Sequence, residues 1–140
     1  NVKLNRTTIQ HNILEQITDY HLSLIGSVER TTVSTHQDKL NHIPDFIFTN
    51  SNGNKINIEI ELSKKSAPRY TKLMQDVAKD NPDAIIYILD SKTKIKSFAS
   101  IMPKWHKLFF ISIDELIKNI NELGQIKPLA QEASLFESPI

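Results

Sequence analysis

Polar and apolar residues alternate strictly from Lys55 to Leu62, which is the repeat of a strand with one buried face. The apolar positions of this run are Ile56, Ile58, Ile60 and Leu62, and the polar positions are Lys55, Asn57, Glu59 and Glu61. A second apolar run covers residues 43–50, and the intervening Asn52-Gly53 is the dipeptide that most strongly predicts a tight turn. The pattern therefore predicts an antiparallel hairpin with strands at 43–50 and 55–62.

Two helices with apolar stripes are predicted on either side of this hairpin. The stripe over residues 5–25 is the buried face of an amphipathic helix, and Gly26 fits its C-terminal cap. The second helix begins after Ser63 or Ser66, has Pro68 in its first turn and ends at Asn81-Pro82-Asp83. The stripes consist of Ile9, Ile13, Ile17, Tyr20 and Leu24 in the first helix, and of Tyr70, Leu73, Met74 and Val77 in the second.

The remaining pattern predicts further strands and helices. The β-branched run at 27–34 is typical of a first strand, and the polar residues 35–42 of a loop. The nearly unbroken apolar run at 84–90 is typical of a strand covered on both faces. The later elements are a helix from Ser91 to about Met102, a strand at 108–113, and a helix that Asp114 caps and Gly124 ends.

The order of these elements predicts an α/β fold with a mixed sheet flanked by helices. Strands joined by a hairpin run antiparallel, whereas a strand–helix–strand crossover makes two strands parallel. A chain of 140 residues suffices for one core, so we expect a single domain over residues 1–124. Residues 125–140 show no periodicity and are expected to form a tail.

Composition and charge narrow the functional classes. The net charge of +1 excludes a uniformly basic surface, so any contact with DNA must come from local clusters of lysine and arginine. The absence of cysteine excludes disulfides, thiolate zinc sites and cysteine nucleophiles, and it fits a reducing compartment. No apolar run approaches the ~20 residues of a membrane span, and no signal-peptide pattern opens the chain. The first residue is Asn and not Met, which leaves open a domain before it.

Three carboxylates gather around the predicted hairpin. Glu59 and Glu61 share one strand face at a separation of about 7 Å, and Asp45 stands near the start of the partner strand. Lys64 and Lys65 follow directly. Oxygen ligands near a lysine suit Mg²⁺ and phosphodiester chemistry. The alternative is that Glu59 and Glu61 are ordinary solvent-facing side chains, as the alternation alone predicts.

The register of the hairpin decides whether Asp45 joins the two glutamates. A two-residue turn at Asn52-Gly53 places Asp45 opposite Ile60, on the apolar face. Asp45 faces Glu59 or Glu61 if the turn has an odd length or the strands contain a bulge. The metal-site hypothesis therefore requires something other than the tight turn that Asn52-Gly53 predicts.

The histidines and tyrosines have structural interpretations that we favour over chemical ones. His11 and Glu15, four residues apart on the first helix, are interpreted as a solvated pair, and His21 as a satisfied histidine at the core boundary. Tyr20, Tyr70 and Tyr87 fall on apolar stripes or in a buried strand, which indicates packing. A relaxase that uses paired histidines is disfavoured because no His-x-His occurs in the chain.

Pro44-Asp45 followed fourteen residues later by Glu59-Ile60-Glu61, on a hairpin that leads into a helix, resembles the PD-(D/E)xK nuclease superfamily. The predicted order of helix, three strands, helix and strand over residues 5–90 is similar to the core of this restriction-endonuclease-like fold. The run from Ile58 to Ser66, with Arg69-Tyr70 after it, is more narrowly similar to plasmid replication-relaxation proteins and to MOB-C class mobilisation relaxases.

The resemblance implies roles for individual residues. Asp45, Glu59 and Glu61 would hold Mg²⁺ or Mn²⁺, and Lys65 would support the phosphate or position water. Glu61 stands where most of the superfamily has a lysine. The DNA backbone would be contacted by Lys64, Arg69 and Lys72, and His11 or Glu29 would correspond to upstream residues of the plasmid families.

The resemblance thus implies a metal-dependent endonuclease that nicks plasmid or mobile-element DNA in the bacterial cytoplasm, alongside other replication or transfer proteins. The superfamily also contains inactive relatives, so a second hypothesis is a nuclease-fold module that binds DNA or docks proteins without cleaving. A third is an unrelated α/β interaction domain whose carboxylates are merely exposed.

Overall fold

The computed structural model of the chain describes residues 6–31 and 40–131. Its helices are α1 (Arg6–Ser23), α3 (Ala67–Asp80), the short 3₁₀ helix η1 (Lys92–Lys94), α4 (Ile95–Ile101) and α5 (Ile113–Leu123). Its strands are β1 (Ser27–Arg30), β2 (Phe46–Thr49), β3 (Lys55–Glu61), β4 (Ala84–Leu89), β5 (Leu108–Ser112) and β6 (Leu129–Ala130). None of these helices is both long and apolar enough to cross a bilayer.

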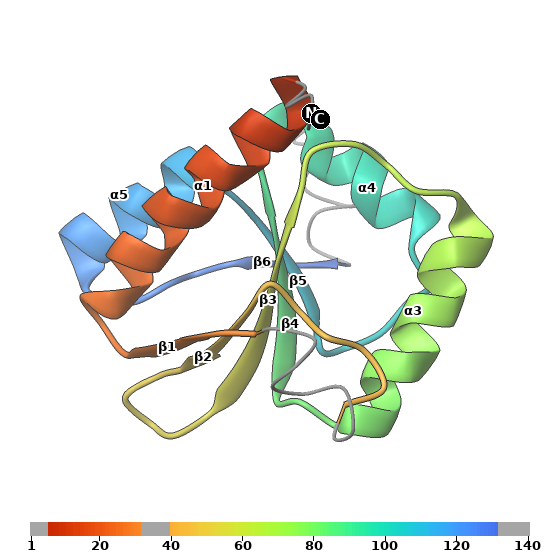
Figure 1. The fold of residues 1–140 in the computed structure, drawn as a ribbon, viewed down its shortest axis with the longest axis horizontal. Helices are drawn as coiled ribbons and strands as arrows, with labels where there is room; N and C mark the ends of the chain where they lie inside the picture. The colour runs from red at the N-terminus through yellow and green to blue at the C-terminus, as the bar shows by residue number, and fades with distance from the viewer. Residues whose placement is uncertain (1–5, 32–39, 132–140) are drawn as a thin grey trace, which may run out of the picture.

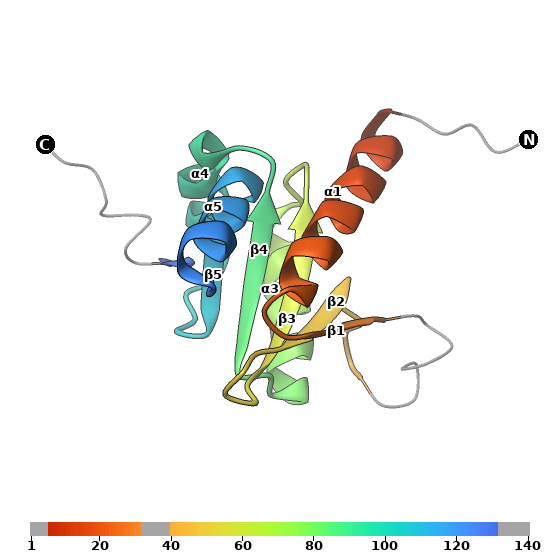
Figure 2. The same ribbon diagram turned by 90° about the vertical axis from the view of Figure 1, so that its left-hand side faces the viewer.

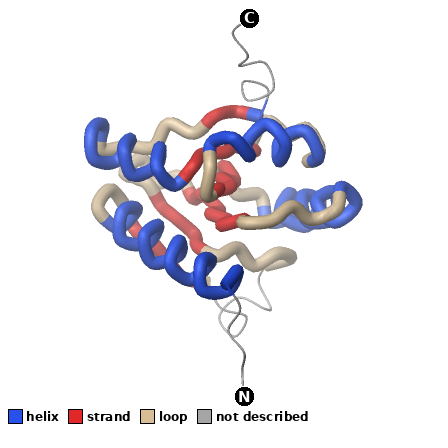
Figure 3. Tube along the Cα trace, turned by 90° about the horizontal axis from the view of Figure 1, so that it is seen from above, coloured by secondary structure: helices blue, strands red, loops and turns tan. Residues whose placement is uncertain are grey.

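The strands in the described part of the chain form a six-stranded mixed sheet in the order β1-β2-β3-β4-β5-β6. Neighbouring strands from β1 to β3 are antiparallel, those from β3 to β5 are parallel, and β6 runs antiparallel to β5. Helices α1 and α5 cover one face, and α3 and α4 cover the other (Figure 1). Seen from above, the strands lie between helices on both sides (Figure 3). The mixed α/β fold predicted from the sequence is thereby confirmed.

Two apolar clusters hold the layers together, one on each face of the sheet. On the α1 and α5 face, Phe46, Ile58 and Ile88 pack with Leu22 and Leu116. On the α3 and α4 face, β4 and β5 pack against both helices through Tyr70, Met74, Tyr87, Phe98 and Phe110. Strand β4 contributes to both clusters, as its unbroken apolar run predicted.

The hairpin of β2 and β3 has a wider turn than Asn52-Gly53 predicted. Phe46 faces Ile58 and Thr49 faces Lys55, so residues 50–54 form the loop. The Asn50 side chain stabilises it by accepting hydrogen bonds from the backbone N–H groups of Asn52 and Asn54, each at 3.0 Å, and Gly53 has a φ of 82°. The two-residue turn is therefore wrong, and the register is the one that the metal-site hypothesis requires.

The orientation of α1 also differs from the prediction. Four of the five residues of its expected buried stripe are exposed, by 45% for Ile9, 50% for Ile13, 65% for Tyr20 and 58% for Leu24. The helix instead contacts the sheet through Leu14, Thr18 and Leu22, with Ile17 at the boundary. Since α1 carries apolar residues on two sides, periodicity alone could not identify the side that packs.

Several element ends were predicted correctly and others were not. Ser66 caps α3, and Gly124 ends α5 with a left-handed φ of 66°. Helix α5 is capped by Ser112, not Asp114, because the Ser112 hydroxyl accepts from the Glu115 N–H at 3.2 Å. The short strand β6 falls within the expected tail. Residues 32–34 of the expected first strand lie outside the described residues.

Gly26 does not act as a left-handed cap, since α1 ends at Ser23 and Gly26 has no positive φ. A Cβ at this position would lie 2.5 Å from the Thr49 carbonyl oxygen and 2.6 Å from the Phe48 ring. Glycine is therefore needed for the close approach of the α1–β1 turn to β2.

Candidate functional site

The candidate site lies where β3 extends past the first residue of β2 while it stays paired with β4. The last β2–β3 pair joins Phe46 to Ile58, so Ile60 has no partner residue in β2. Two side chains contact the main-chain groups of Ile60 in place of β2. Asp45 Oδ2 accepts a hydrogen bond from the Ile60 N–H at 2.8 Å, and His11 Nε2 lies 3.2 Å from the Ile60 carbonyl oxygen. Asp45 and α1 are thus fixed against the free edge of β3.

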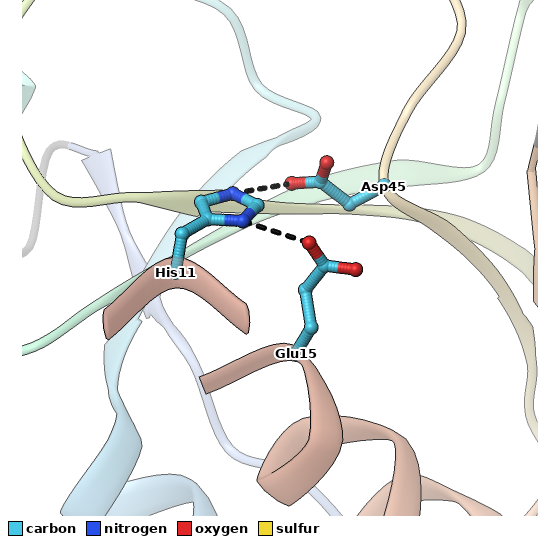
Figure 4. Close-up of side chains that lie close together, drawn as sticks. All are labelled: His11, Glu15 and Asp45. Carbon is cyan, nitrogen blue, oxygen red and sulfur yellow. Dashed lines mark ion pairs between the residues drawn. The ribbon is translucent and has the colours of Figure 1, made fainter. Parts of the chain in front are cut away.

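His11 links two carboxylates at this edge (Figure 4). Its Nδ1 lies 2.7 Å from Glu15 Oε1, and its Nε2 lies 3.7 Å from Asp45 Oδ2. Among the described residues, these three side chains have ligand atoms within 4.8 Å of one another. Burial raises the pKa of Asp45, and the Glu15 charge adds to this, against the opposing Ile60 hydrogen bond and the charges of His11 and His42. The cluster is half-buried and reachable from solvent.

Glu59 lies on the opposite face of β3 and is only 9% exposed. Its Oε2 is 2.5 Å from Nε2 of His42. The backbone around His42 is held by Asp80, whose carboxylate accepts from the N–H of Asn41 at 2.8 Å and from the N–H of His42 at 3.0 Å. The segment that leads to Asp45 and β2 is thereby tied to Asp80, the last residue of α3.

The pKa values of Glu59 and His42 are both raised. Burial raises the pKa of Glu59 despite the His42 hydrogen bond, and the negative charges of Asp45 and Glu61 raise it further. Burial alone would lower the pKa of His42, but the hydrogen bond and charge of Glu59, with Asp80 and Asp45, outweigh it and raise the pKa. Each of the two groups therefore keeps its proton to a higher pH than the free side chain does.

Glu61 shares the α3 side of β3 with Glu59 and is paired differently. Its Oε2 accepts from Lys65 Nζ at 2.6 Å and from the Tyr70 hydroxyl at 3.1 Å. The same hydroxyl accepts from the Lys65 backbone N–H at 3.1 Å, which fixes the start of α3 against the strand. Lys65 therefore sits directly on a carboxylate, with its side chain 28% exposed.

A buried hydroxyl without a partner lies on the same face. Tyr87 is paired with Glu59 across β3 and β4, is 1% exposed, stacks on Phe110 and makes an edge-to-face contact with Tyr70. Its oxygen has no hydrogen-bond partner among the described residues. Burial and the charges of Glu59 and Glu61 raise the pKa of Tyr87, so it remains a neutral donor.

An open groove of about 380 Å³ runs along α3 and reaches His42 and Lys65, the partners of Glu59 and Glu61. Its lining includes His42, Lys65, Arg69, Lys72 and Asp76. Arg69 is exposed, whereas Lys72 is held by Asp76 at 3.0 and 3.1 Å. Lys64 is exposed and lies outside the residues that line the groove.

The structure brings the predicted residues to one end of β3 but divides them. Glu59 and Glu61 share a face as predicted, while Asp45 turns to the strand edge and joins His11 and Glu15. Of the two upstream candidates, His11 reaches this edge and Glu29 lies exposed on β1. The sequence analysis missed three residues here: Glu15, interpreted as solvated; His42, placed in an unremarkable loop; and Tyr70, assigned to packing alone.

No family model, curated protein or solved structure matches this chain.

Proposed function

We propose that the chain is a metal-dependent DNA endonuclease that nicks plasmid or mobile-element DNA. The observation that carries this proposal is that Asp45, Glu59, Glu61 and Lys65 all lie at one end of β3, with Asp45 at the strand edge and the other three on the α3 side, beside a groove lined by basic side chains. The order of α1, three antiparallel strands, α3 and a parallel strand supports it, since the resemblance implies this order.

The donor atoms fit a divalent cation. Carboxylates such as Asp45 and Glu15 suit Mg²⁺ or Mn²⁺, and the imidazole of His11 favours a first-row transition ion over Mg²⁺. On the other face of β3, the buried Tyr87 hydroxyl next to Glu59 has no partner in the described chain, and the bound water of an ion held by Glu59, rather than by the His11 cluster, would supply one. A bound cation would polarise a phosphate oxygen and lower the pKa of water.

The chain's own residues would contribute charge and protons. Lys65 can turn from Glu61 toward a phosphate, because its side chain is partly exposed and lines the groove. His42, which contacts Glu59, lines the groove and would exchange a proton there. Lys64, Arg69 and Lys72 would contact successive phosphates of the backbone.

The second candidate, a DNA-binding or docking module without cleavage, is favoured by a specific observation. Each carboxylate already has a partner in the chain: Asp45 has the Ile60 N–H, Glu59 has His42, and Glu61 has Lys65 and Tyr70. A site whose acids are satisfied by protein groups does not require a cation to fold.

Nicking of supercoiled plasmid in Mg²⁺ or Mn²⁺ distinguishes the nuclease from the module that binds without cleaving. We expect the wild type to nick, Asp45→Asn and Glu59→Gln to lose nicking, and Glu122→Gln to retain it, since Glu122 is exposed on α5. If the folded wild type nicks the plasmid with neither Mg²⁺ nor Mn²⁺, the nuclease proposal is wrong. Metal-independent, salt-sensitive DNA binding would then support the binding module.

A further inference from the structure

The end of the sheet away from the candidate site carries a pocket of about 300 Å³. Its walls come from the β2–β3 loop, the turn after α1, the segment after α5 and the first residues of β3, β4 and β5. Figure 2 shows this loop at the bottom, whereas the arrowheads of β3 and β4 point to the other end. Glu59 and Glu61 lie in the last part of β3, so the pocket is separate from the candidate site.

The interior of the pocket is apolar. Phe48 of β2 and Phe109 of β5 contribute aromatic rings, and Ile56 of β3 and Ile86 of β4 contribute aliphatic side chains. Phe48 and Ile86 are 1% and 2% exposed and form the floor, whereas Ile56 and Phe109 are half-buried. All four belong to the apolar cluster on the α1 and α5 face. The pocket is therefore a part of this core that no described segment fills.

No charged side chain lines the pocket among the described residues, although 24% of the chain is charged. The groove along α3 differs in this respect, since its lining includes Lys65, Arg69, Lys72 and Asp76. A charged ligand would lose its water in the pocket without gaining a counter-charge, which is costly. The pocket therefore suits a neutral molecule.

Neutral polar side chains line the opening of the pocket. Ser51 and Asn52 lie in the β2–β3 loop and Gln125 follows α5, and all three are exposed. Their side chains form no hydrogen bond with another described residue, so one hydroxyl and two amides can bind a ligand. The loop is held open by Asn50, and its width gives the pocket one wall. An apolar cleft with a few polar groups is the usual form of a small-molecule site.

We propose that this pocket binds a neutral aromatic molecule of two fused rings, with a polar group directed to Asn52 or Gln125. The size follows from the volume, because a cavity of about 150 Å³ lined by Leu, Ile and Phe holds one benzene ring. The pocket has about 300 Å³, which accommodates a second ring. Phe48 and Phe109 favour an aromatic ligand, since aromatic rings attract one another in offset-stacked and edge-to-face contacts.

Titration of indole into the wild type, followed in amide NMR spectra, tests the location of the site. We expect saturable shifts at residues 51–56 and 124–126, which line or adjoin the pocket, and no shifts at Lys65 or Arg69 in the groove. The absence of saturable shifts at millimolar indole, or shifts centred on the groove, would overturn the proposal.

A variant that fills the pocket tests the same point by affinity. Ala84 lines the pocket beside its strand partner Ile56, so the ring of Ala84→Phe should occupy the space and lower the affinity for indole at least 10-fold. Ala78→Phe, the same change at an exposed position of α3, should bind as the wild type does. Circular dichroism checks that both variants are folded. Unchanged affinity in folded Ala84→Phe would contradict the proposed site.

Two probes of similar shape test the preference for a neutral ligand in the wild type alone. Naphthol is uncharged at neutral pH, because phenols titrate near pH ~10, whereas naphthoate is an anion. Naphthol should bind at least 10-fold more tightly, and equal affinities would contradict the proposal. These measurements require neither metal nor cleavage, so their failure would leave the nuclease proposal unaffected, and a failure to nick DNA would leave this site unaffected.

Discussion

The two sides of β3 hold their acidic groups in different ways. On the α1 side, Asp45 shares His11 with Glu15 in a half-buried cluster with both side chains more than 20% exposed. On the α3 side, Glu59 is 9% exposed and pairs with His42 at 2.5 Å. A half-exposed cluster can exchange its partners at little cost, whereas a buried pair must stay matched. The acid on the α3 side is therefore held more rigidly than the acids on the α1 side.

The largest expected effect comes from removing one partner of the buried pair. His42→Ala should lower the free energy of unfolding by roughly 2–3 kcal/mol, because it leaves Glu59 buried without its hydrogen bond. His11→Ala should lower it by less than about 1 kcal/mol, since its partners remain accessible to water. Urea unfolding at neutral pH measures both. Equal losses in the two variants would remove the distinction between the two sides.

The pH dependence of stability should follow the buried pair. The pKa values of Glu59, Asp45 and His42 are all raised in the folded chain, so the folded state holds protons that the unfolded state releases. Their contribution to stability is full below the ordinary pKa of each group and is lost as pH rises through the folded value.

Unfolding free energies at pH 5 and pH 8 check this. These groups should make the wild type less stable at pH 8, by about 1.4 kcal/mol for each unit of pKa shift. In Glu59→Gln, which does not titrate at this position, the loss between the two pH values should shrink. An unchanged pH profile in this variant would show that the pair does not control the dependence.

Two basic side chains that line the groove, Arg69 and Lys72, should contribute unequally to DNA binding. Arg69→Ala should weaken binding several-fold and reduce the dependence of log K on log salt by about 1. Lys72→Ala should have a smaller effect, because Asp76 already neutralises Lys72 at 3.0 Å. Fluorescence anisotropy with labelled DNA at several salt concentrations measures both. A larger loss from Lys72→Ala would indicate that DNA displaces Asp76.

The smallest effect on stability is expected at Tyr87. Tyr87→Phe removes a hydroxyl with no partner in the described chain, so the free energy of unfolding should change by less than about 1 kcal/mol without metal. With Mn²⁺ present, the variant should gain less thermal stability than the wild type does. Equal gains in melting temperature would show that the hydroxyl plays no part in metal binding.

The sequence predicted the sheet better than it predicted the site. The strict alternation from Lys55 to Glu61 is the pattern of a strand with one apolar face, and the apolar run of β4 is the pattern of a strand buried on both faces. Both features can be read from neighbouring residues in the sequence. Ser66 capped its helix as expected for the same local reason. The turn at 50–54 escaped prediction because the Asn50 side chain holds it open, a contact that outweighs the preference of Asn52-Gly53.

The site depends on how distant segments meet. Asp45 reaches His11 only because α1 packs with Leu22 against the sheet, and α1 has apolar residues on both sides. The partner of Glu59 comes from a polar loop in which His42 has no pattern to distinguish it. The spacing of Glu59 and Glu61 along one strand was enough to identify them as candidates. The side chains that they contact are determined by tertiary packing, which cannot be read from that spacing.

Titration of Mn²⁺ into the protein by calorimetry tests the central claim, that the carboxylates around β3 hold a metal ion, most directly. We expect the wild type to bind Mn²⁺, Asp45→Asn to reduce the affinity at least 10-fold, and Glu122→Gln to bind as the wild type does. A wild type that binds no Mn²⁺ or Mg²⁺, or an Asp45→Asn variant with unchanged affinity for the ion, would contradict it.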